Sequence, residues 1–525
     1  MKTNNTNSPN WRTIQSKMKL PAELSALNEL VHNLWWVWNT DALDLFKDLD
    51  SDLWKESYNP VIMLQKLSPE RVRHIKQDKE LMGRIKDIIN RFEQYISQDF
   101  ESDKPSVAYF SMEYGFTHIL KTYSGGLGIL AGDFLKEASD IKVDITGVGL
   151  LYRYGYFTQR ISPEGQQVAE YEAQNFNELP IRQVLCENGL PLVLAVPFHD
   201  RDVYVNVWCV NVGRIKLYLM DSDNELNSEY NRSITHQLYG GDWENRIKQE
   251  YLLGIGGIVL LEKLGIRKDV YHCNEGHAAF INVQRLASLI ESKGLSFEQA
   301  LEVVRASGLY TVHTPVAAGH DYFEEWLVGK YMGHFCDRLG ISWQEFMDMG
   351  RERPGSDQKF SMSVFALNTC MEANGVSLLH GKVSRSMFQP VWPGYYAEEL
   401  HVGHVTNGVH MPTWAAKESK ELYEETFGED FYADQSNHDI WNRIHHVPDK
   451  KIWDLRISLK KRFLEYVGEE MKQKFTKSQV PPTLLFDAVE NFNPQALFVG
   501  FARRFATYKP VSYTHLRAHE TSQDL

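Results

Sequence analysis

Residues 107–152 read VAYFSMEYGFTHILKTYSGGLGILAGDFLKEASDIKVDITGVGLLY. Runs of apolar, β-branched and aromatic residues lie at both ends of this stretch, at 107–114 and 143–152. Between them come a glycine-rich turn at 124–128 and the helical sequence ILAGDFLKEASD. Strand, turn, helix and strand in this order are the repeating unit of a parallel α/β sheet. The stretch therefore predicts an α/β fold.

Similar strand-like runs follow along the chain, at 269–273, 308–312, 401–406 and 496–501. Each of these four runs ends in polar residues: NEGH at 274–277, HTP at 313–315, NGVH at 407–410 and ARRFATYK at 502–509. In open α/β sheets, ligands bind just outside the carboxyl ends of the strands. We therefore expect these polar clusters to converge on one crevice.

The region before the first strand, residues 20–100, reads as helical. Pro21 suits a first helical turn, and apolar residues recur at helical spacing from Leu24 to Trp38. We interpret the tryptophans of this stripe as core residues rather than as sugar platforms, because aromatic side chains at helical period mostly pack inward. Helical sequence resumes after a predicted domain boundary near 411–420 and leads to the strand predicted at 496–501.

Composition narrows the class of protein. The chain has 525 residues, 43% of them apolar, and a formal net charge of -13, which argues against a general nucleic-acid surface. Its five cysteines are widely spaced and form no CxxC pair, so we expect neither disulfides nor a zinc ribbon. Since no apolar run reaches about 18 residues and the N-terminus is polar, we predict a cytoplasmic protein without a membrane partner.

The turn Ser124–Gly128 has the chemistry of an anion or sugar-phosphate cradle, because glycines allow close backbone approach and helix N–H groups point at a ligand. A simple turn is the alternative reading. The turn is not the dinucleotide fingerprint GxGxxG, and the chain has no P-loop, which disfavours nicotinamide and nucleoside triphosphate chemistry.

Histidines and an acid follow the strand at 269–273. His272, Glu275 and His277 permit a metal site, but neighbouring positions at a strand end point in different directions, so we favour hydrogen bonds to a sugar or to the loop. His313 precedes Thr314 and Pro315, where proline fixes an extended turn, so functional and structural roles both stay open.

Three cations, Arg503, Arg504 and Lys509, lie within seven residues after the strand at 496–501, in a chain that is otherwise acidic. A solvated charged face is the alternative. We favour an anion site, because cations beside a buried strand pair with phosphate oxygens or carboxylates.

Taken together, the chain resembles the α-glucan phosphorylase family, and in particular its shorter bacterial and archaeal branch. The resemblance runs from about Leu20 to Lys509, and its motifs are LPAELSALNELVHNLWWVWN, VAYFSMEYG, YSGGLGILAGD, GVGLLYRYGYF, LYGGDWENRIKQEYLLGIGG, HCNEGHAAF, TVHTPVAAGHD, NGVSLLHGKVS, VTNGVHMPTW and FARRFATYK. It implies reversible transfer of a terminal α-1,4-linked glucosyl unit of glycogen or maltodextrin to orthophosphate, giving glucose 1-phosphate with retention. Pyridoxal 5'-phosphate is the implied cofactor.

The implied fold is a pair of Rossmann-like domains of the glycosyltransferase-B type. On this resemblance, residues 1–100 form the helical extension, 101–415 the sugar-side domain and 416–509 the start of the phosphate- and cofactor-side domain. Residues 510–525 match nothing in the family, and we interpret them as a non-native tail. A homo-oligomer stays open.

The resemblance also implies roles for single residues. Gly126 and Leu127 would present backbone N–H groups to the phosphate and glucosyl unit, and the carbonyl of His313 would stabilise the developing oxocarbenium-like sugar. Asn407 would bond a glucosyl hydroxyl, Tyr508 would touch the sugar, and the substrate-binding residues Asp242, Glu275 and His277 would line the sugar-side loop and acceptor path. Arg504 and Lys509 would clamp the substrate phosphate, and Arg503 would neighbour the cofactor phosphate.

One departure is large. The family's Schiff-base lysine lies in a Gly-Thr-Ser-Asn-Met-Lys type motif, and nothing like it occurs here, so we expect this chain to be an inactive, truncated form. Two alternatives remain, a nucleotide-sugar glucosyltransferase of the glycogen-synthase kind and a non-catalytic glucan-binding remnant. The sequences HCNEGH and TNGVH favour the phosphorylase.

Overall fold

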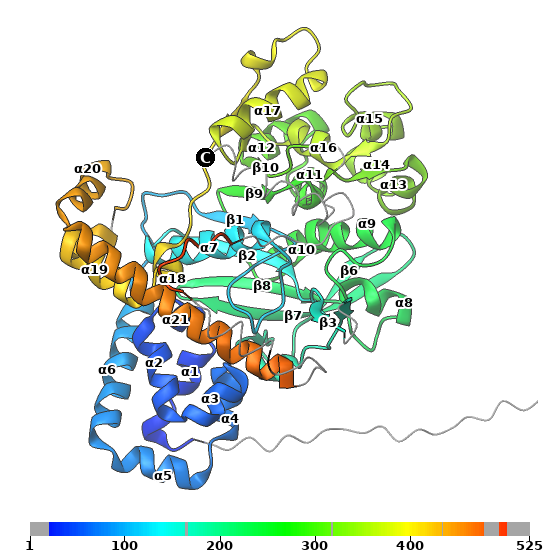
Figure 1. The fold of residues 1–525 in the computed structure, drawn as a ribbon. Coiled ribbons are helices and arrows are strands. Elements are labelled where there is room, and N and C mark those ends of the chain that lie inside the picture. The colour runs from blue at the N-terminus through cyan, green and yellow to red at the C-terminus, as the bar shows by residue number, and fades with distance from the viewer. Residues whose placement is uncertain are drawn as a thin grey trace, which may run out of the picture. The chain divides into compact units, whose positions relative to one another are not determined.

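The computed structural model describes residues 20–162, 166–316, 319–432, 434–476, 483 and 493–500. The chain divides into two compact units (Figure 1). The first holds the residues up to Gln98 together with Asn175–Ile181, and the second holds Asp99–Gln174 and the residues from Arg182 onward. The sheet and all strands named below belong to the second unit.

The first unit is helical, as the sequence predicts for residues 20–100. Instead of one long helix it contains short ones: η1 (Ala22–Leu24), α1 (Leu27–Val31), η2 (Leu34–Val37), α2 (Thr40–Leu49), α3 (Ser51–Ser57), α4 (Pro60–Lys66), α5 (Pro69–Gln77) and α6 (Lys79–Ile96). Side chains that cap helix N-termini explain the breaks: Asp50, Asn59, Ser68 and Asp78 each accept a hydrogen bond from a backbone N–H of the following helix. Trp35 and Trp38 are buried, which confirms their predicted role in a core.

The second unit is built on a ten-stranded mixed sheet, which confirms the predicted α/β class. The strand order is β14-β13-β10-β9-β1-β2-β8-β7-β5, and β6 pairs with β7. The bounds are β1 (Val107–Phe110), β2 (Ile145–Leu150), β5 (Arg182–Gln183), β6 (Val193–Pro197), β7 (Asp202–Val212), β8 (Ile215–Asp221), β9 (Val270–Asn274), β10 (Gly308–Val312), β13 (Glu372–Gly375) and β14 (Val402–His404). From β14 to β8 all pairs are parallel. All six residues of β2 are buried, as expected for a parallel strand covered on both faces.

Five of the six strands predicted from sequence are present, as β1, β2, β9, β10 and β14. The prediction of a strand over 496–501 is wrong for the residues that the structure describes there, because 493–500 contain turns and irregular chain. Leu497 is 87% exposed in this segment. A lone apolar run forms a strand only beside a hydrogen-bonding neighbour, and no described strand lies next to this segment.

The antiparallel end of the sheet was not predicted. Strands β7 and β8 form a hairpin through Gly213, whose φ of 59° lies in the left-handed region that glycine tolerates. Inward and outward residues alternate along β6 and β7, the pattern of strands with one covered face. Two further two-stranded sheets, β3 (Thr158–Ile161) with β4 (Gln167–Glu170) and β11 (Tyr322–Phe323) with β12 (Phe360–Ser361), lie outside the main sheet.

Helices between the strands complete the second unit. Those that matter below are α7 (Gly126–Asp140), α9 (Trp243–Tyr251), α13 (Glu325–Met332), α16 (Met362–Thr369), α17 (Leu378–Phe388), α18 (Met411–Trp414), α19 (Lys417–Phe427), α20 (His438–Trp441) and α21 (Asp449–Thr476). The last three confirm the helical sequence predicted after residue 420. Within the described part of the chain, no helix combines the length and the apolarity that crossing a membrane requires.

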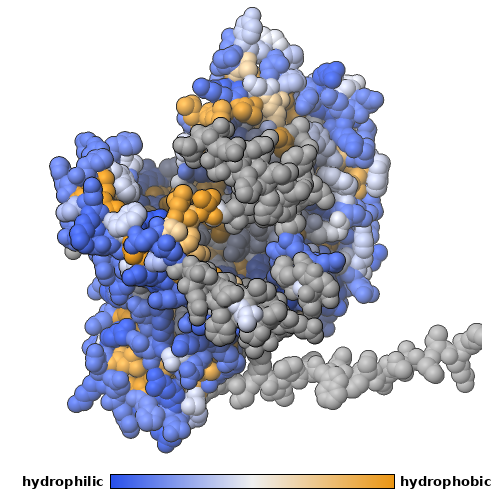
Figure 2. Space-filling view, in the orientation of Figure 1, coloured by the Kyte–Doolittle hydropathy of each residue, from blue (hydrophilic) through white to orange (hydrophobic). Residues whose placement is uncertain are grey.

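Exposure of apolar and sulfur-containing side chains is uneven. Leu379 and Val409 are 71% and 68% exposed, and Figure 2 shows apolar patches on an otherwise mostly hydrophilic face. The five cysteines are free: Cys186 is exposed, Cys209 and Cys336 are half-buried, and Cys273 and Cys370 are buried. The expectation that they form no disulfides is confirmed.

Candidate functional site

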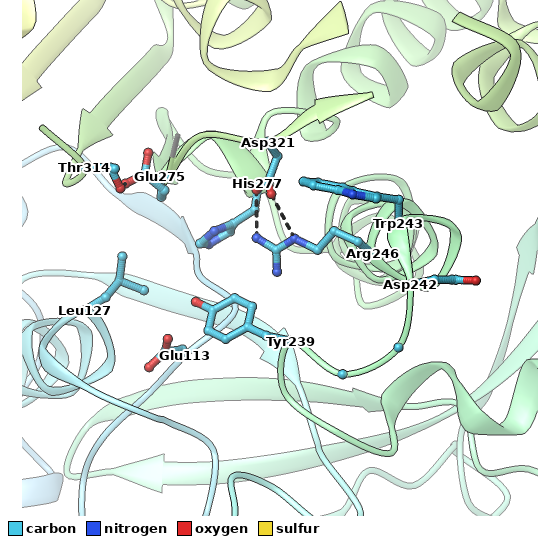
Figure 3. Close-up of a pocket in the computed structure, with 13 residues that line it drawn as sticks. Glu113, Leu127, Tyr239, Asp242, Trp243, Arg246, Glu275, His277, Thr314 and Asp321 are labelled. Atoms are coloured by element: carbon cyan, nitrogen blue, oxygen red, sulfur yellow. Dashed lines mark hydrogen bonds and ion pairs between the residues drawn. The ribbon is translucent and has the colours of Figure 1, made fainter. Parts of the chain in front are cut away.

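A cavity of about 530 Å³ opens beyond the carboxyl ends of β1, β9 and β10, where the sequence predicts a crevice (Figure 3). Thirteen residues line it: Glu113, Leu127, Tyr239, Gly240, Gly241, Asp242, Trp243, Arg246, Glu275, His277, Thr314, Gly319 and Asp321. Four of them, Leu127, Asp242, Glu275 and His277, are site residues proposed from the sequence. The structure therefore brings together side chains from segments more than 150 residues apart.

The glycine-rich turn is held by a buried acid, Glu113. Its carboxylate accepts hydrogen bonds from the backbone N–H of Ser124 at 2.8 Å, from the Ser124 hydroxyl at 3.0 Å and from the N–H of Gly125 at 3.3 Å. Helix α7 begins at the next residue, Gly126, so the first-turn N–H groups of Gly126 and Leu127 have no partner within the helix. Glu113 thus fixes the turn and leaves these donors for a ligand.

Helix α7 approaches the turn that follows β1 very closely at Gly132. A Cβ atom built on Gly132 would lie 2.1 Å from the backbone oxygen of Gly115, a distance that no side chain tolerates. The N–H of Gly115 in turn donates to the backbone oxygen of Gly128 at 2.7 Å. Glycine at position 132 is therefore what allows the helix to present its N-terminus at the pocket.

Glu275 lies at the end of β9 with φ of 77°, a conformation that costs energy for any residue but glycine. Its carboxylate accepts the backbone N–H of His313 at 2.9 Å, the Thr314 hydroxyl at 3.2 Å and the Tyr310 hydroxyl at 3.3 Å. Glu275, the acid predicted to contact sugar, thus aligns the turn after β10.

His313 itself is tied to the neighbouring strand. Its Nε2 lies in hydrogen-bond contact with Oδ1 of Asn274, whose Nδ2 donates to the Ser111 hydroxyl at 3.0 Å. Because the amide oxygen accepts, Nε2 carries the proton and Nδ1 is left as an acceptor. Burial lowers the pKa of His313, an effect that the nearby Glu275 carboxylate partly opposes.

The other two histidines of the segment have separate partners. Nε2 of His277 accepts the backbone N–H of Met112 at 3.2 Å, and Nε2 of His272 contacts the Thr311 hydroxyl at 2.8 Å. Burial lowers the pKa of each ring to about 3, so both are neutral. The described residues contain no group of three or more His, Cys, Asp or Glu side chains placed to hold a metal ion.

Arg246 is the only arginine or lysine among the described residues lining the pocket, and it forms a partly buried ion pair with Asp321 (Figure 3). Its Nη2 lies 2.7 Å from Asp321 and its Nε lies 2.9 Å from Glu250, while its guanidinium stacks over the Tyr239 ring at 4.7 Å. Burial alone would lower the pKa of Arg246, but the two acids outweigh it and the pKa is raised. Burial followed by the charge of Asp321 raises the pKa of Glu250 well above its ordinary value.

Sequence reasoning missed the contacts of Arg246 with Glu250 and with Asp321. Arg246 and Glu250 are four residues apart on α9, a spacing that places them on one helix face and was the available signal. Asp321 was hidden in the motif TVHTPVAAGHD, and nothing in the sequence marks it as the partner of Arg246.

Asp242 and Trp243 line the pocket from the start of α9. The Asp242 carboxylate caps α9 by accepting the N–H of Asn245 at 2.9 Å. Trp243 is 57% exposed, and its ring meets Phe323 edge-on at 5.9 Å. The aspartate predicted to contact sugar therefore has a structural bond too, and beside it lies an aromatic surface on which a sugar ring can stack.

Charge distinguishes this pocket from an anion site. Its lining has four acids, Glu113, Asp242, Glu275 and Asp321, against one arginine. The residues predicted to bind phosphate and cofactor, Arg503, Arg504 and Lys509, and Tyr508, predicted to contact the sugar, lie outside the described residues. Asn407 is exposed, and its N–H donates to the backbone oxygen of Val376 at 3.0 Å; it is not among the described residues that line the pocket.

Comparison with known proteins gives two kinds of match. Residues 20–120 match a family described as "Protein of unknown function (DUF3417)". The chain is 40% identical over 502 residues to the maltodextrin phosphorylase of Thermococcus litoralis, covering 94% of this chain and 59% of that protein. It is 38% identical over 524 residues to the glycogen phosphorylase of Mycobacterium tuberculosis, covering 95% and 60%. The chain thus spans about three fifths of the length of these two relatives.

The glycogen phosphorylase of Aquifex aeolicus is 35% identical to this chain over 487 residues, which cover 92% of the chain and 69% of that relative. This chain is thus more than 30% identical to a glycogen phosphorylase and covers more than two thirds of its length. The resemblance seen in the sequence motifs points to the same family. The chain belongs to the glycogen and maltodextrin phosphorylase family.

Proposed function

We propose that this chain provides the sugar-binding part of an α-glucan phosphorylase, which moves a terminal α-1,4-linked glucosyl unit to orthophosphate and gives glucose 1-phosphate with retention. The observation that supports it best is the pocket itself. It combines hydroxyl-binding carboxylates with an exposed tryptophan, Trp243, and a neutral histidine, His277. Such a lining suits an uncharged polyol.

In this proposal, the first-turn N–H groups of Gly126 and Leu127 face the reacting sugar and phosphate. The backbone carbonyl of His313 stabilises positive charge that develops on the sugar, and Asn407 bonds a glucosyl hydroxyl. Glu275 supports this arrangement, because its hydrogen bonds to His313 and Thr314 hold the turn that aims the carbonyl.

The side chains that line the pocket offer phosphate no unpaired cation. Among the described lining residues are four carboxylates and one guanidinium already paired with acids, so an oxyanion at the Gly126 and Leu127 N–H groups needs cations from elsewhere in the chain. We therefore propose that Arg504 and Lys509 clamp the substrate phosphate, with Tyr508 on the sugar. We further propose a glycosyltransferase-B arrangement in which residues 101–415 form the sugar-side domain and 416–509 begin the second Rossmann-like domain.

Pyridoxal 5'-phosphate is the cofactor that the family implies, and it supplies a phosphate group beside the substrate phosphate. Its aldehyde needs a lysine amine, and none of the described residues lining the pocket is a lysine. In the part of the chain that the structure describes, the two fully buried lysines are engaged elsewhere, Lys136 beside Asp133 and Lys248 against the Tyr230 ring. The described residues do not fit the cofactor, and its predicted neighbour Arg503 lies outside them.

Glucan binding is tested by calorimetric titration of the 525-residue chain with maltoheptaose, with cellohexaose as the β-linked control. We expect maltoheptaose to bind and cellohexaose not to bind. Binding of UDP-glucose or ADP-glucose instead would favour the nucleotide-sugar glucosyltransferase. Binding of both glucans alike would contradict a site specific for α-1,4 links.

Phosphorolysis is tested in a hybrid in which residues 20–432 replace the matching segment of the Aquifex aeolicus relative. We expect glucose 1-phosphate from maltoheptaose and phosphate. A folded hybrid that binds maltoheptaose but releases no glucose 1-phosphate would favour the non-catalytic glucan-binding alternative.

A further inference from the structure

The segment 405–414, which carries Asn407, is fastened at both ends. At the sheet, the N–H groups of Val405 and Asn407 donate to the backbone oxygens of Gly375 and Val376, each at 3.0 Å. The other end leads into α18, which lies beside α7 (Figure 1). The segment therefore bridges the edge of the sheet and a helix that begins at the glycine-rich turn.

His410 makes the first set of contacts with α7. Its side chain is fully buried, and its Nε2 lies 3.0 Å from the Asp140 carboxylate while Nδ1 lies 2.8 Å from the Thr413 hydroxyl. A carboxylate only accepts, so Nε2–H donates to Asp140 and, in the neutral ring, Nδ1 accepts from Thr413. One ring thus fixes both the start of α18 and the last turn of α7.

Asp133 makes the second set. Its Oδ2 accepts the backbone N–H of His410 at 3.1 Å and the indole Nε1–H of Trp414 at 2.6 Å, and its Oδ1 lies 3.7 Å from the buried amine of Lys136. Asp133 is itself only 3% exposed. A buried carboxylate that serves two donors and a cation holds its surroundings in one geometry, because each partner would be left unsatisfied elsewhere.

We propose that Asp133 and His410 are positioning residues that fix Asn407 relative to the N-terminus of α7; this rests on the proposed glucan-binding function. Asp133 lies seven residues after Gly126 on one continuous helix, about 10 Å along its axis. The same helix therefore carries the Gly126 and Leu127 N–H groups at one end and the anchor of the Asn407 segment further along. A shift of the anchor changes the spacing between Asn407 and these donors.

The first test measures maltoheptaose affinity of the 525-residue chain. His410→Ala removes the Asp140 and Thr413 contacts and should raise Kd at least about fivefold, whereas His410→Gln, which can still donate to Asp140, should recover most of the affinity. The exposed His401 provides the matched control, and His401→Gln should leave Kd unchanged. Equal loss in the Gln and Ala variants of His410 would contradict the role of the Asp140 bond.

A double-mutant cycle with Asn407→Ala separates positioning from general destabilisation. If the anchor acts through Asn407, His410→Ala should cost little further affinity once Asn407 is replaced. Independent, additive losses would overturn the proposal, since they would show that His410 affects binding by another route.

Hydrogen exchange of the free chain gives a readout that needs no ligand. His410→Ala and Asp133→Ala should speed exchange of the amides of 405–410 while the β9 and β10 amides keep their protection. Unchanged exchange in 405–410 would overturn the anchor. A wild-type chain that binds no maltoheptaose would contradict the proposed function, and the exchange result would still decide whether Asp133 and His410 hold this segment.

Discussion

Nε2 of His277, at the end of β9, accepts a hydrogen bond from the backbone N–H of Met112, after the end of β1, at 3.2 Å. A ring nitrogen that accepts carries no proton, so the proton of His277 lies on Nδ1. Burial lowers the pKa of this ring to about 3. This hydrogen bond links the chain after β9 to the chain after β1 at the pocket. Because the His277 ring is neutral, it cannot serve as a general acid at ordinary pH.

We therefore predict that His277 keeps its neutral Nδ1–H form from about pH 8 to about pH 5. Ring ¹⁵N shifts of histidine-labelled protein, assigned by the signal lost in His277→Gln, measure this directly. Because the folded pKa lies below the unfolded one, His277 should reduce stability as pH falls from about 6.5 towards 3. A ring that titrates near pH 6.5 would contradict the hydrogen bond to Met112.

Replacement of Glu113 should loosen the glycine-rich turn. Glu113→Ala removes the carboxylate that accepts the N–H groups of Ser124 and Gly125, and should lower the free energy of unfolding by about 1–3 kcal/mol and weaken maltoheptaose binding. Glu113→Gln keeps one acceptor oxygen and should lose less. Urea unfolding and calorimetry measure the two effects, with the exposed Glu187→Gln as control. Equal behaviour of Glu113→Ala and wild type would contradict the assigned role.

Removal of the Arg246 guanidinium should be costly, because it leaves the partly buried Asp321 carboxylate without its cation and the buried Glu250 carboxyl without its neighbour. We expect Arg246→Met to lower the free energy of unfolding by about 3–5 kcal/mol. Arg246→Lys should lie in between, since an ammonium cannot pair with Asp321 in the two-pronged manner of Nε and Nη2. Urea unfolding checks the order against Arg201→Met, which removes an exposed ion pair. A lysine variant as stable as wild type would show that charge alone suffices.

The buried amine of Lys136 should make the stability of the folded protein rise with pH in the alkaline range. Burial lowers its pKa to about 8, and the carboxylate of Asp133 only partly opposes this. Between about pH 8 and 10.5 the unfolded chain holds a proton that the folded chain has released, so Lys136 makes stability rise with pH there, by up to about 3 kcal/mol. We expect the stability difference between wild type and Lys136→Met to shift in favour of wild type as pH rises from 8 to 10. A difference independent of pH would show that the amine is not desolvated.

Sequence reasoning located five of the seven strands in the parallel part of the sheet, because strand and turn signals there are local; it missed β13 and β8. The run at 308–312 is followed by HTP, and β10 has the same bounds. The antiparallel strands β5 to β8 gave a weaker signal, since residues that alternate between two faces do not form the continuous apolar runs on which the prediction depended. The strand prediction at 496–501 was wrong for a different reason, because an apolar run predicts a strand without indicating which strand would pair with it.

The site shows the same limit. Leu127, Asp242, Glu275 and His277 could be placed at the pocket because the motifs that contain them resemble those of the α-glucan phosphorylase family. The partnership of Arg246 with Asp321 could not, because 75 residues separate them and only the folded chain brings them to 2.7 Å. The neutral state of His277 likewise depends on burial and on Met112, and neither is visible in the letters HCNEGH.

The uneven exposure of the cysteines makes this protein suited to single-site chemical labelling. Burial raises the pKa of the Cys209 thiol to about 11 and raises that of Cys336, so neither forms the reactive thiolate readily near neutral pH, and Cys273 and Cys370 are inaccessible. Cys186 is exposed on the turn that joins β5 to β6. A maleimide dye should therefore attach to Cys186 alone, at a position outside the pocket lining, without mutation of the other four thiols.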